Sequence, residues 1–244
     1  MLRSSDMGLN FRGAARLAVP LLGAALLACS QSGSTTSSSP DAAKILRDAG
    51  QAMTTVKTVA ADVKFGGASI QVQGLTLVSA ASKLRLPADS DTIFKVKQGD
   101  FLVDLQVVTT GGRVFLKLPF GGFSELTGPE AQDVPDVSQL MNAESGLPAL
   151  LAAGKDPAYQ GTERVAGVQT DKVTATYTAD QIGKLLGGRL TPRGDVQATI
   201  WVGQADHLVR KAVLSGPFTS SGKSNVEVDL HDFNQPVTIT SPTT

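Results

Sequence analysis

The feature that most restricts the fold is a repeated alternation of apolar and polar side chains in short runs from residue 59 onwards. In residues 101–107 every odd-numbered side chain is apolar, whereas Asp104 and Gln106 lie between them. Residues 114–118 and 196–202 alternate in the same way. A period of two is typical of strands that have one face in a core and one in water. The pattern therefore predicts a large sheet with one apolar face.

Hairpin signals separate these runs. Gly-Gly occurs at 66–67 and 111–112, and Gln-Gly-Asp occurs at 98–100. Links of this length join antiparallel neighbours, because a parallel pair needs a crossover of a dozen residues or more. We expect one antiparallel sheet, whose last strand lies over residues 236–242.

Helical spacing of apolar residues predicts a helix over residues 38–56, with Ser39 as its cap. Residues 136–154 are predicted to form two short helices, because Gly146 and Pro148 interrupt them. Many strands and few helices predict an α+β fold in which helices cover one face of the sheet.

An apolar run near the N-terminus ends at Cys29, the only cysteine in the chain. Arg3, Arg12 and Arg16 precede this run, and it holds about a dozen apolar residues, fewer than the ~20 that a spanning helix needs. A basic region followed by a short apolar region is the layout of a secretory signal. Residues 26–29, Leu-Leu-Ala-Cys, resemble the bacterial lipobox, in which the thiol is acylated and the chain is cut before the cysteine. A buried core segment and a transmembrane helix are the competing interpretations.

The predicted organisation has three parts. Residues 1–28 are a lipoprotein signal peptide, residues 29–39 are the lipidated Cys29 with a flexible Ser/Thr-rich tether, and residues 40–244 are one domain. Without residues 1–28 the chain has 22 − 3 = 19 basic and 22 − 1 = 21 acidic residues, a formal charge of −2. Nucleic acid is not an expected partner, because its recognition needs a basic surface. We expect a monomer that is lipid-anchored to the plasma membrane and faces the periplasm or cell-wall space.

The sequence lacks the common catalytic motifs. Gly-x-Ser-x-Gly, the phosphate-binding loop, His-Glu-x-x-His and Gly-x-Gly-x-x-Gly are all absent. Its two histidines, His207 and His231, have no cysteine or histidine neighbours that would make a zinc site. We therefore expect no enzyme activity, no metal and no cofactor.

Several short motifs in a fixed order carry a resemblance to a known family. One is a Gly-x-Glu-x-Val-x-Gly-x-x-Thr run, formed by Gly161, Glu163, Val165, Gly167 and Thr170. A Trp-Val strand, a turn and a basic return strand follow, with Trp201-Val202, Asp206-His207 and Arg210-Lys211, and the chain closes with Phe233-Asn234, Pro236-Val237 and Ile239. Together with the lipobox, this order resembles the LppX/LprA/LprF/LprG family of actinobacterial lipoproteins.

The resemblance implies a curved antiparallel half-barrel of the LolA/LolB type, with helices on its concave face enclosing an apolar cavity. It also implies that the protein binds multiply acylated lipids or glycolipids, or triacylglycerol, and carries them from the plasma membrane towards the outer envelope. A membrane lipid transporter is then a candidate partner. Each CH₂ group removed from water contributes ~0.8 kcal/mol, so such lipids need a carrier across an aqueous space.

The apolar strand faces and the broken helix supply the candidate cavity residues. On the strands these are Phe101, Val103, Leu105, Val107, Val114, Leu116, Leu118, Val196, Ile200 and Val202, and on the roof Leu140, Leu147, Leu150 and Leu151. Phe120 and Phe123 flank Gly121-Gly122, either as a mobile apolar lip at the cavity mouth or as a plain turn. The alternative function is a structural or interaction lipoprotein with a filled core. An internal apolar cavity would favour the carrier, and a packed core the alternative.

Overall fold

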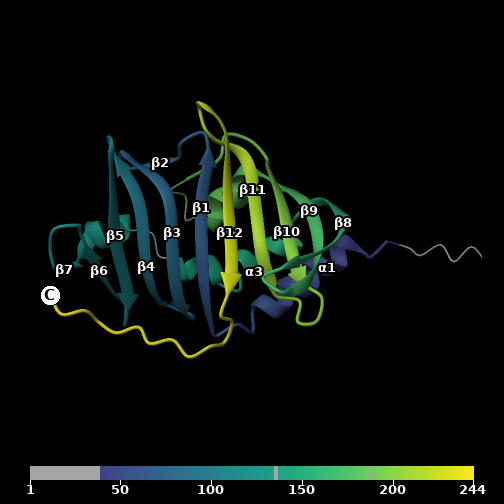
Figure 1. The fold of residues 1–244 in the computed structure, drawn as a ribbon, viewed down its shortest axis with the longest axis horizontal. Helices are drawn as coiled ribbons and strands as arrows, with labels where there is room; N and C mark the ends of the chain where they lie inside the picture. Colours follow the sequence, from purple (N-terminus) through teal and green to yellow (C-terminus); the bar gives the residue numbers. More distant parts are fainter. Residues whose placement is uncertain (1–38, 135–136, 187, 189) are drawn as a thin grey trace, which may run out of the picture. The chain divides into compact units, whose positions relative to one another are not determined.

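Twelve strands in the described part of the chain form one open antiparallel sheet (Figure 1). The structure is a computed structural model that describes residues 39–134, 137–186, 188 and 190–244. The predicted signal peptide, Cys29 and the tether up to residue 38 lie outside the described residues. The strands are β1 (Thr58–Gly67), β2 (Gln71–Val72), β3 (Leu75–Arg85), β4 (Asp89–Gln98), β5 (Phe101–Thr110), β6 (Arg113–Lys117), β7 (Phe123–Leu126), β8 (Lys155–Val165), β9 (Val168–Tyr177), β10 (Val196–Gly203), β11 (Val209–Thr219) and β12 (Gly222–His231).

The strand order is β7-β6-β5-β4-β3-β1-β12-β11-β10-β9-β8, and β2 pairs with β3. The chain builds the sheet outwards from β1 to the β7 edge, crosses to the other edge, and returns through β8 to β12, which pairs with β1. All pairs are antiparallel, which confirms the predicted sheet type.

The helices lie on one face of the sheet, behind the strands in Figure 1. They are α1 (Ala42–Met53), α2 (Gly128–Asp133), the 3₁₀ helix η1 (Val137–Met141), α3 (Leu147–Ala152) and α4 (Ala179–Leu185). We call this helix-bearing face of the curved sheet the concave face, and the opposite one the convex face. Helix α1 contacts β8, β9 and β10, and η1 contacts β3 and β4.

The first helix begins later than predicted. Asp41, rather than Ser39, is its N-cap, and the Asp41 carboxylate accepts a hydrogen bond from the backbone N–H of Lys44 at 3.1 Å. A carboxylate caps well because it satisfies a free N–H and also complements the positive end of the helix dipole.

Two glycines allow the close packing around α3, Gly50 where α3 meets α1 and Gly146 where it meets the end of η1. A Cβ atom at Gly50 would lie 2.7 Å from the backbone oxygen of Pro148, and one at Gly146 would lie 2.6 Å from the backbone oxygen of Leu140. Gly146 is the N-cap of α3, and Pro148 lies in its first turn. The predicted division into two short helices is confirmed, because η1 ends at Met141 and α3 begins at Leu147.

The pairing register shows which side chains share the concave face. Val107 pairs with Thr92, which pairs with Ser82, and Ser82 pairs with Ala61. Ala61 is part of the core beneath the helices. The apolar set of β5 therefore lies on the same face as that core, as the alternation predicted.

The end of the chain differs from the prediction, because residues 236–242 form no strand. Strand β12 already has partners on both sides, so the chain that leaves it has no adjacent ladder to join. The segment instead places Ile239 on Val108 and Phe115, in a small buried cluster on the convex face of β5 and β6. The backbone oxygen of Ile239 accepts a hydrogen bond from Arg85 at 3.2 Å. This cover explains why β5 and β6 carry apolar residues on both faces.

The sequence pattern missed the first part of one strand and the whole of another. The pattern predicts strands from Thr162 onwards, whereas β8 begins at Lys155, and its register shifts twice along β9. Each shift interrupts the alternation by which strands are recognised. Strand β7 was interpreted only as part of a turn.

We expect Ile239→Ala to destabilise the fold, because it removes buried contacts with Val108 and Phe115 and leaves a cavity. The expected loss is about 2–4 kcal/mol in the free energy of unfolding, measured by denaturant titration. Thr240→Ala, at the exposed next residue, is the matched control and should be near neutral. Equal stabilities for the two variants would contradict this role of the C-terminal segment.

Candidate functional site

One half of the concave face is a packed core. Val196, Ile200 and Val202 are at most 3% exposed, and they pack with α1 and the neighbouring strands. Leu151 belongs to the same core, and Leu147 and Leu150 are partly buried against it. Leu140 is half-buried on η1. These predicted cavity residues therefore lie in or on a filled core, and any lipid contact of theirs stays a prediction.

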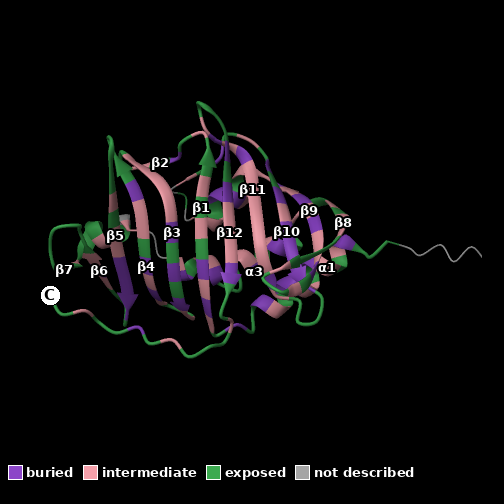
Figure 2. Cartoon of the chain, viewed as in Figure 1, coloured by how far each residue is buried: buried purple, intermediate pink, exposed green. Residues whose placement is uncertain are grey.

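The other half of the concave face is open. Seven of the predicted side chains lie here, on β5, on β6 and on the residue after β6. Together they are called the open strip, which consists of Phe101, Val103, Leu105, Val107, Val114, Leu116 and Leu118. Phe101 is 77% exposed and Leu118 is 54% exposed, whereas Val107 is buried and the others are half-buried. Figure 2 shows the change along β5, from exposed at its start to buried at its end. The structure thus brings this set together on one uncovered surface.

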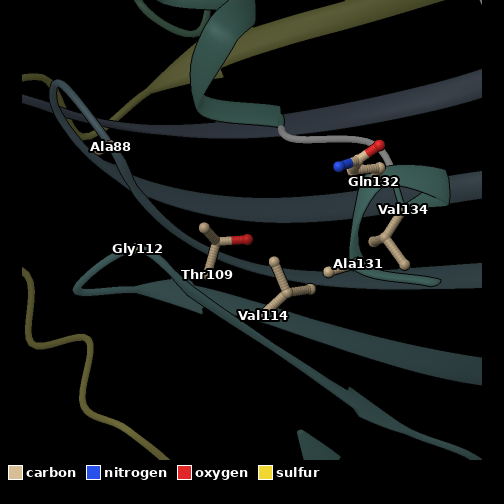
Figure 3. Close-up of a pocket in the computed structure, with 7 residues that line it drawn as sticks. All are labelled: Ala88, Thr109, Gly112, Val114, Ala131, Gln132 and Val134. Carbon is tan, nitrogen blue, oxygen red and sulfur yellow. The ribbon is translucent and has the colours of Figure 1, made fainter. Parts of the chain in front are cut away.

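A pocket of about 430 Å³ lies at the buried end of the open strip, which we call its inner end. Thr109 and Val114, which are register partners on β5 and β6, project towards the α2 segment (Figure 3). Residues from the sheet, its turns and the α2 segment line the pocket, namely Ala88, Thr109, Gly112, Val114, Ala131, Gln132 and Val134. Its volume lies within the ~300–1,000 Å³ typical of small-molecule sites.

The open strip is long enough for an extended chain. On β5 the strip runs from Phe101 to Val107, six residue steps, which at ~3.4 Å per residue span ~20 Å. One bilayer leaflet, half of a ~30 Å hydrocarbon core, is ~15 Å thick. Between the strip and the packed half, the hydroxyls of Ser82 and Thr92 hydrogen-bond to each other at 3.0 Å. Both side chains are buried, so this paired contact separates the open strip from the packed half.

The predicted aromatic lip is divided between two environments. Phe120 is 99% exposed, whereas Phe123 lies on β7 and packs against the Val108 and Phe115 cluster of the convex face. The Lys117 ammonium group lies 5.7 Å from the centre of the Phe123 ring. Only Phe120 is free, so the two rings do not form one lip.

The convex face carries a charged network around Trp201. The indole N–H donates to a carboxylate oxygen of Glu163 at 3.0 Å, and Lys172 contacts the same oxygen at 3.2 Å. Lys172 and Lys211 lie 4.9 and 5.8 Å from the ring centre of Trp201. Lys211 also pairs with Glu227 at 3.1 Å. Trp201 is thus a packing residue, 7% exposed.

The Gly-x-Glu-x-Val-x-Gly-x-x-Thr run has a structural role. It forms the hairpin between β8 and β9, where Ala166 and Gly167 have φ values of 46° and 83°. Positive φ at both positions is typical of a two-residue hairpin turn. The Thr170 hydroxyl donates to the backbone oxygen of Glu163 at 2.6 Å, which fixes the strand that presents Glu163 to Trp201.

The comparisons with known proteins agree with this geometry. A profile of the LppX_LprAFG lipoprotein family matches residues 41–239. The chain belongs to this family. It is 28% identical over 224 residues to the "Lipoarabinomannan carrier protein LprG" of Mycolicibacterium smegmatis, covering 90% of this chain and 91% of that one. It is 34% identical over 111 residues to lipoprotein LprA of Mycobacterium tuberculosis, covering 44% and 43%.

Two solved structures of LppX_LprAFG proteins share the fold. LprF from Mycobacterium bovis superposes with a TM-score of 0.68 at 20% identity, covering 84% of this chain and 99% of that one. LppX from Mycobacterium tuberculosis superposes with a TM-score of 0.60 at 23% identity, covering 83% and 100%. The family and the curved antiparallel fold predicted from the sequence are both confirmed.

Within the described residues of this LppX_LprAFG lipoprotein, no helix has the length and apolar character to span a bilayer. In the same part of the chain, no three His, Cys, Asp or Glu side chains gather in a way that could hold a metal ion.

His231 gives the convex network a pH dependence. Burial of the ring by itself lowers the pKa of His231, but hydrogen bonds to Asp232 at 2.9 Å and Asp62 at 3.2 Å outweigh this effect and raise the pKa above 6.5. A raised pKa means that the folded state holds the proton more tightly than the unfolded state. The resulting stabilisation is complete below the unfolded pKa and is lost as the pH rises through the folded pKa.

We therefore expect the difference in Tm between wild type and His231→Gln to shrink as the pH rises from about 5.5 to 8.5. Thermal unfolding across that range measures it. Replacing both Asp62 and Asp232 by Asn should remove the same pH-dependent contribution of His231 to the Tm. A Tm difference that stays constant with pH would refute the assignment.

Proposed function

We propose that this LppX_LprAFG protein is a membrane-anchored carrier of multiply acylated lipids or glycolipids, or of triacylglycerol. It binds the acyl chains along the open strip and in the pocket beside α2, and it carries them from the plasma membrane towards the outer envelope. The observation that carries the proposal is the apolar half of the concave face that the helices leave uncovered. The name of the LprG relative, a lipoarabinomannan carrier, supports the same class of ligand.

The physical reason is the cost of acyl chains in water. At ~0.8 kcal/mol for each CH₂ group, a chain of about a dozen such groups costs on the order of 10 kcal/mol when hydrated. Hydration of the open strip costs a similar free energy per unit of apolar area. An acyl chain that covers the strip therefore removes apolar surface of both the chain and the protein from water. Binding of this kind needs apolar area and no reactive group.

The open side of the strip suits a lipid with a large polar part. When acyl chains lie along β5 and β6, the side of the open strip that no helix covers still faces water. A headgroup on that side keeps its hydration. The pocket under α2 then receives the end of a chain. The packed half of the concave face, held by α1 and α3, supplies stability and does not have to open. The alternative, a structural lipoprotein, needs a filled core throughout, and the open strip disfavours it.

Substitution by Trp separates binding from folding. Val103→Trp and Val114→Trp should fill space that acyl chains need, so that the variants fold normally but carry less lipid. Ile200→Trp is the matched control in the packed half, where the larger ring should overpack and destabilise by ~1–3 kcal/mol. The measurement is paired, with Tm and bound lipid determined by mass spectrometry on the same protein purified from its own host.

The carrier proposal fails if wild type carries no lipid. It also fails if Val103→Trp and Val114→Trp lower the Tm as much as Ile200→Trp does, because the open strip would then be a filled core.

The anchor is part of the proposal and rests on residues 26–29. Ten residue steps separate Cys29 from Ser39, so a fully extended tether spans ~33–36 Å and keeps the domain near its membrane. We expect Cys29→Ala to abolish lipid attachment and the cleavage that follows it. Metabolic labelling with a fatty acid and gel mobility measure this, and a processed, labelled band from the variant would disprove the lipobox interpretation.

A further inference from the structure

The exposed apolar side chains gather at one end of the sheet. Of the five large apolar side chains that the described part of the chain leaves exposed, four lie at the start of β5 and just after β6. We call these the rim. They are Phe101 (77% exposed), Leu102 (52%), Leu118 (54%) and Phe120 (99%). A folded domain rarely leaves such a group in water without a partner.

The rim is built on two neighbouring hairpin ends. In the register, Gln106 of β5 pairs with Lys117 of β6, so Phe101 and Phe120 both extend past this pair in the same direction. Ideal Cβ atoms at Gly121 and Gly122 would meet no atom within 4 Å, so the turn that carries Phe120 projects into open space. Phe101 and Leu118 are also the outermost residues of the open strip.

The charged residues beside the rim are net basic, although the domain as a whole is acidic. Three lysines stand at these hairpin ends, Lys95, Lys97 and Lys117, against Asp100 and Asp104, a local charge of +1. Lys95 pairs with Asp104 at 2.6 Å, which leaves Lys97 and Lys117 against Asp100 alone. The whole of residues 39–244 carries 19 basic and 21 acidic side chains, a charge of −2. The rim therefore has the sign that anionic headgroups attract.

The shape of the rim favours a bilayer over a protein. A stable protein interface buries more than ~1,000 Å² with complementary packing, and it is usually centred on a patch broader than the ends of two hairpins. A bilayer needs only protruding apolar tips beside cationic groups, because the lipids adapt their own packing to them. Phe and Leu are among the side chains that interfacial segments bury at the boundary between headgroups and acyl chains.

We propose that the rim docks the folded domain on an anionic lipid bilayer, with Phe101 and Phe120 inserted below the headgroups. The open strip then continues directly into the acyl region of the leaflet, and a lipid moves between the two without crossing water. The transfer of lipid through this contact rests on the proposed carrier function. The docking itself rests only on the exposed apolar side chains and the lysines beside them.

The test uses the full-length lipidated chain in vesicles of equal parts phosphatidylcholine and phosphatidylglycerol. Phe120→Trp places a fluorophore on the rim, and the buried Trp201 gives the same background in every variant. Gln51→Trp, at an exposed position in the last turn of α1, is the matched control on a helix that packs against β8 to β10 and carries no rim residue. Brominated acyl chains should quench the fluorescence of Phe120→Trp and shift its emission to shorter wavelength, and should leave Gln51→Trp unquenched.

Equal quenching at both sites, or none at Phe120→Trp, overturns the docking proposal. Vesicles of phosphatidylcholine alone should quench less, and unchanged quenching there overturns the part assigned to Lys97 and Lys117.

A second variant separates docking from carrying. The double variant Leu102→Ser, Phe120→Ser changes two rim residues that are not part of the open strip, so it should keep its Tm and its bound lipid, because both side chains are exposed, and should slow lipid transfer between vesicles by about tenfold or more. Wild-type transfer rates from the double variant overturn the docking. Lipid missing from wild type as well defeats the carrier function, while the quenching result still decides whether the rim contacts a bilayer.

Discussion

The structure depends on a mismatch between the width of its sheet and the length of its helices. Eleven strands lie side by side in the main order, and ten spacings of ~4.8 Å make a face ~48 Å wide. The longest helix, α1, has 12 residues and is ~18 Å long. The alternating pattern makes most of the concave face apolar, but the helices are sufficient to bury only part of it. They pack on β8, β9 and β10 and reach as far as β3 and β4, which leaves β5 to β7 largely uncovered.

This division assigns different tasks to the two halves of one sheet. Where α1 and α3 meet over the strands, Gly50 allows a close approach that no larger residue permits, and the core is filled. Where the helices end, the same face continues as the open strip, and α2 covers only its inner end. The C-terminal segment keeps β5 and β6 stable there, because Ile239 buries Val108 and Phe115 from the other side. A binding surface can therefore remain uncovered without unfolding the strands that carry it.

The residues that most resemble the family are not those that line the open strip. The β8–β9 hairpin contains Glu163, Gly167 and Thr170. On the convex face, the indole N–H of Trp201 donates a hydrogen bond to the Glu163 carboxylate. A buried indole N–H needs an acceptor and a turn needs a residue at positive φ, so these positions tolerate few residue types. An acyl chain requires only apolar surface, which many side chains supply. A short motif therefore identifies this family by its structural residues and does not mark its binding surface.

The sequence by itself determined the sheet, its pairing type and its apolar face, because alternation and short glycine links are local and act strand by strand. It also placed all seven residues of the open strip on one surface. It did not show that Val196, Ile200 and Val202 lie in a filled core, since their alternation is the same as that of Val103 and Leu105. The segments that cover a strand are distant from it in the sequence. Helix α1 precedes β1 but packs on β8 to β10, and Ile239 follows β12 but packs on β5 and β6. Only the tertiary structure decided which apolar residues are buried and which stay open, because burial depends on how far a helix reaches across the sheet, and no local pattern records that length.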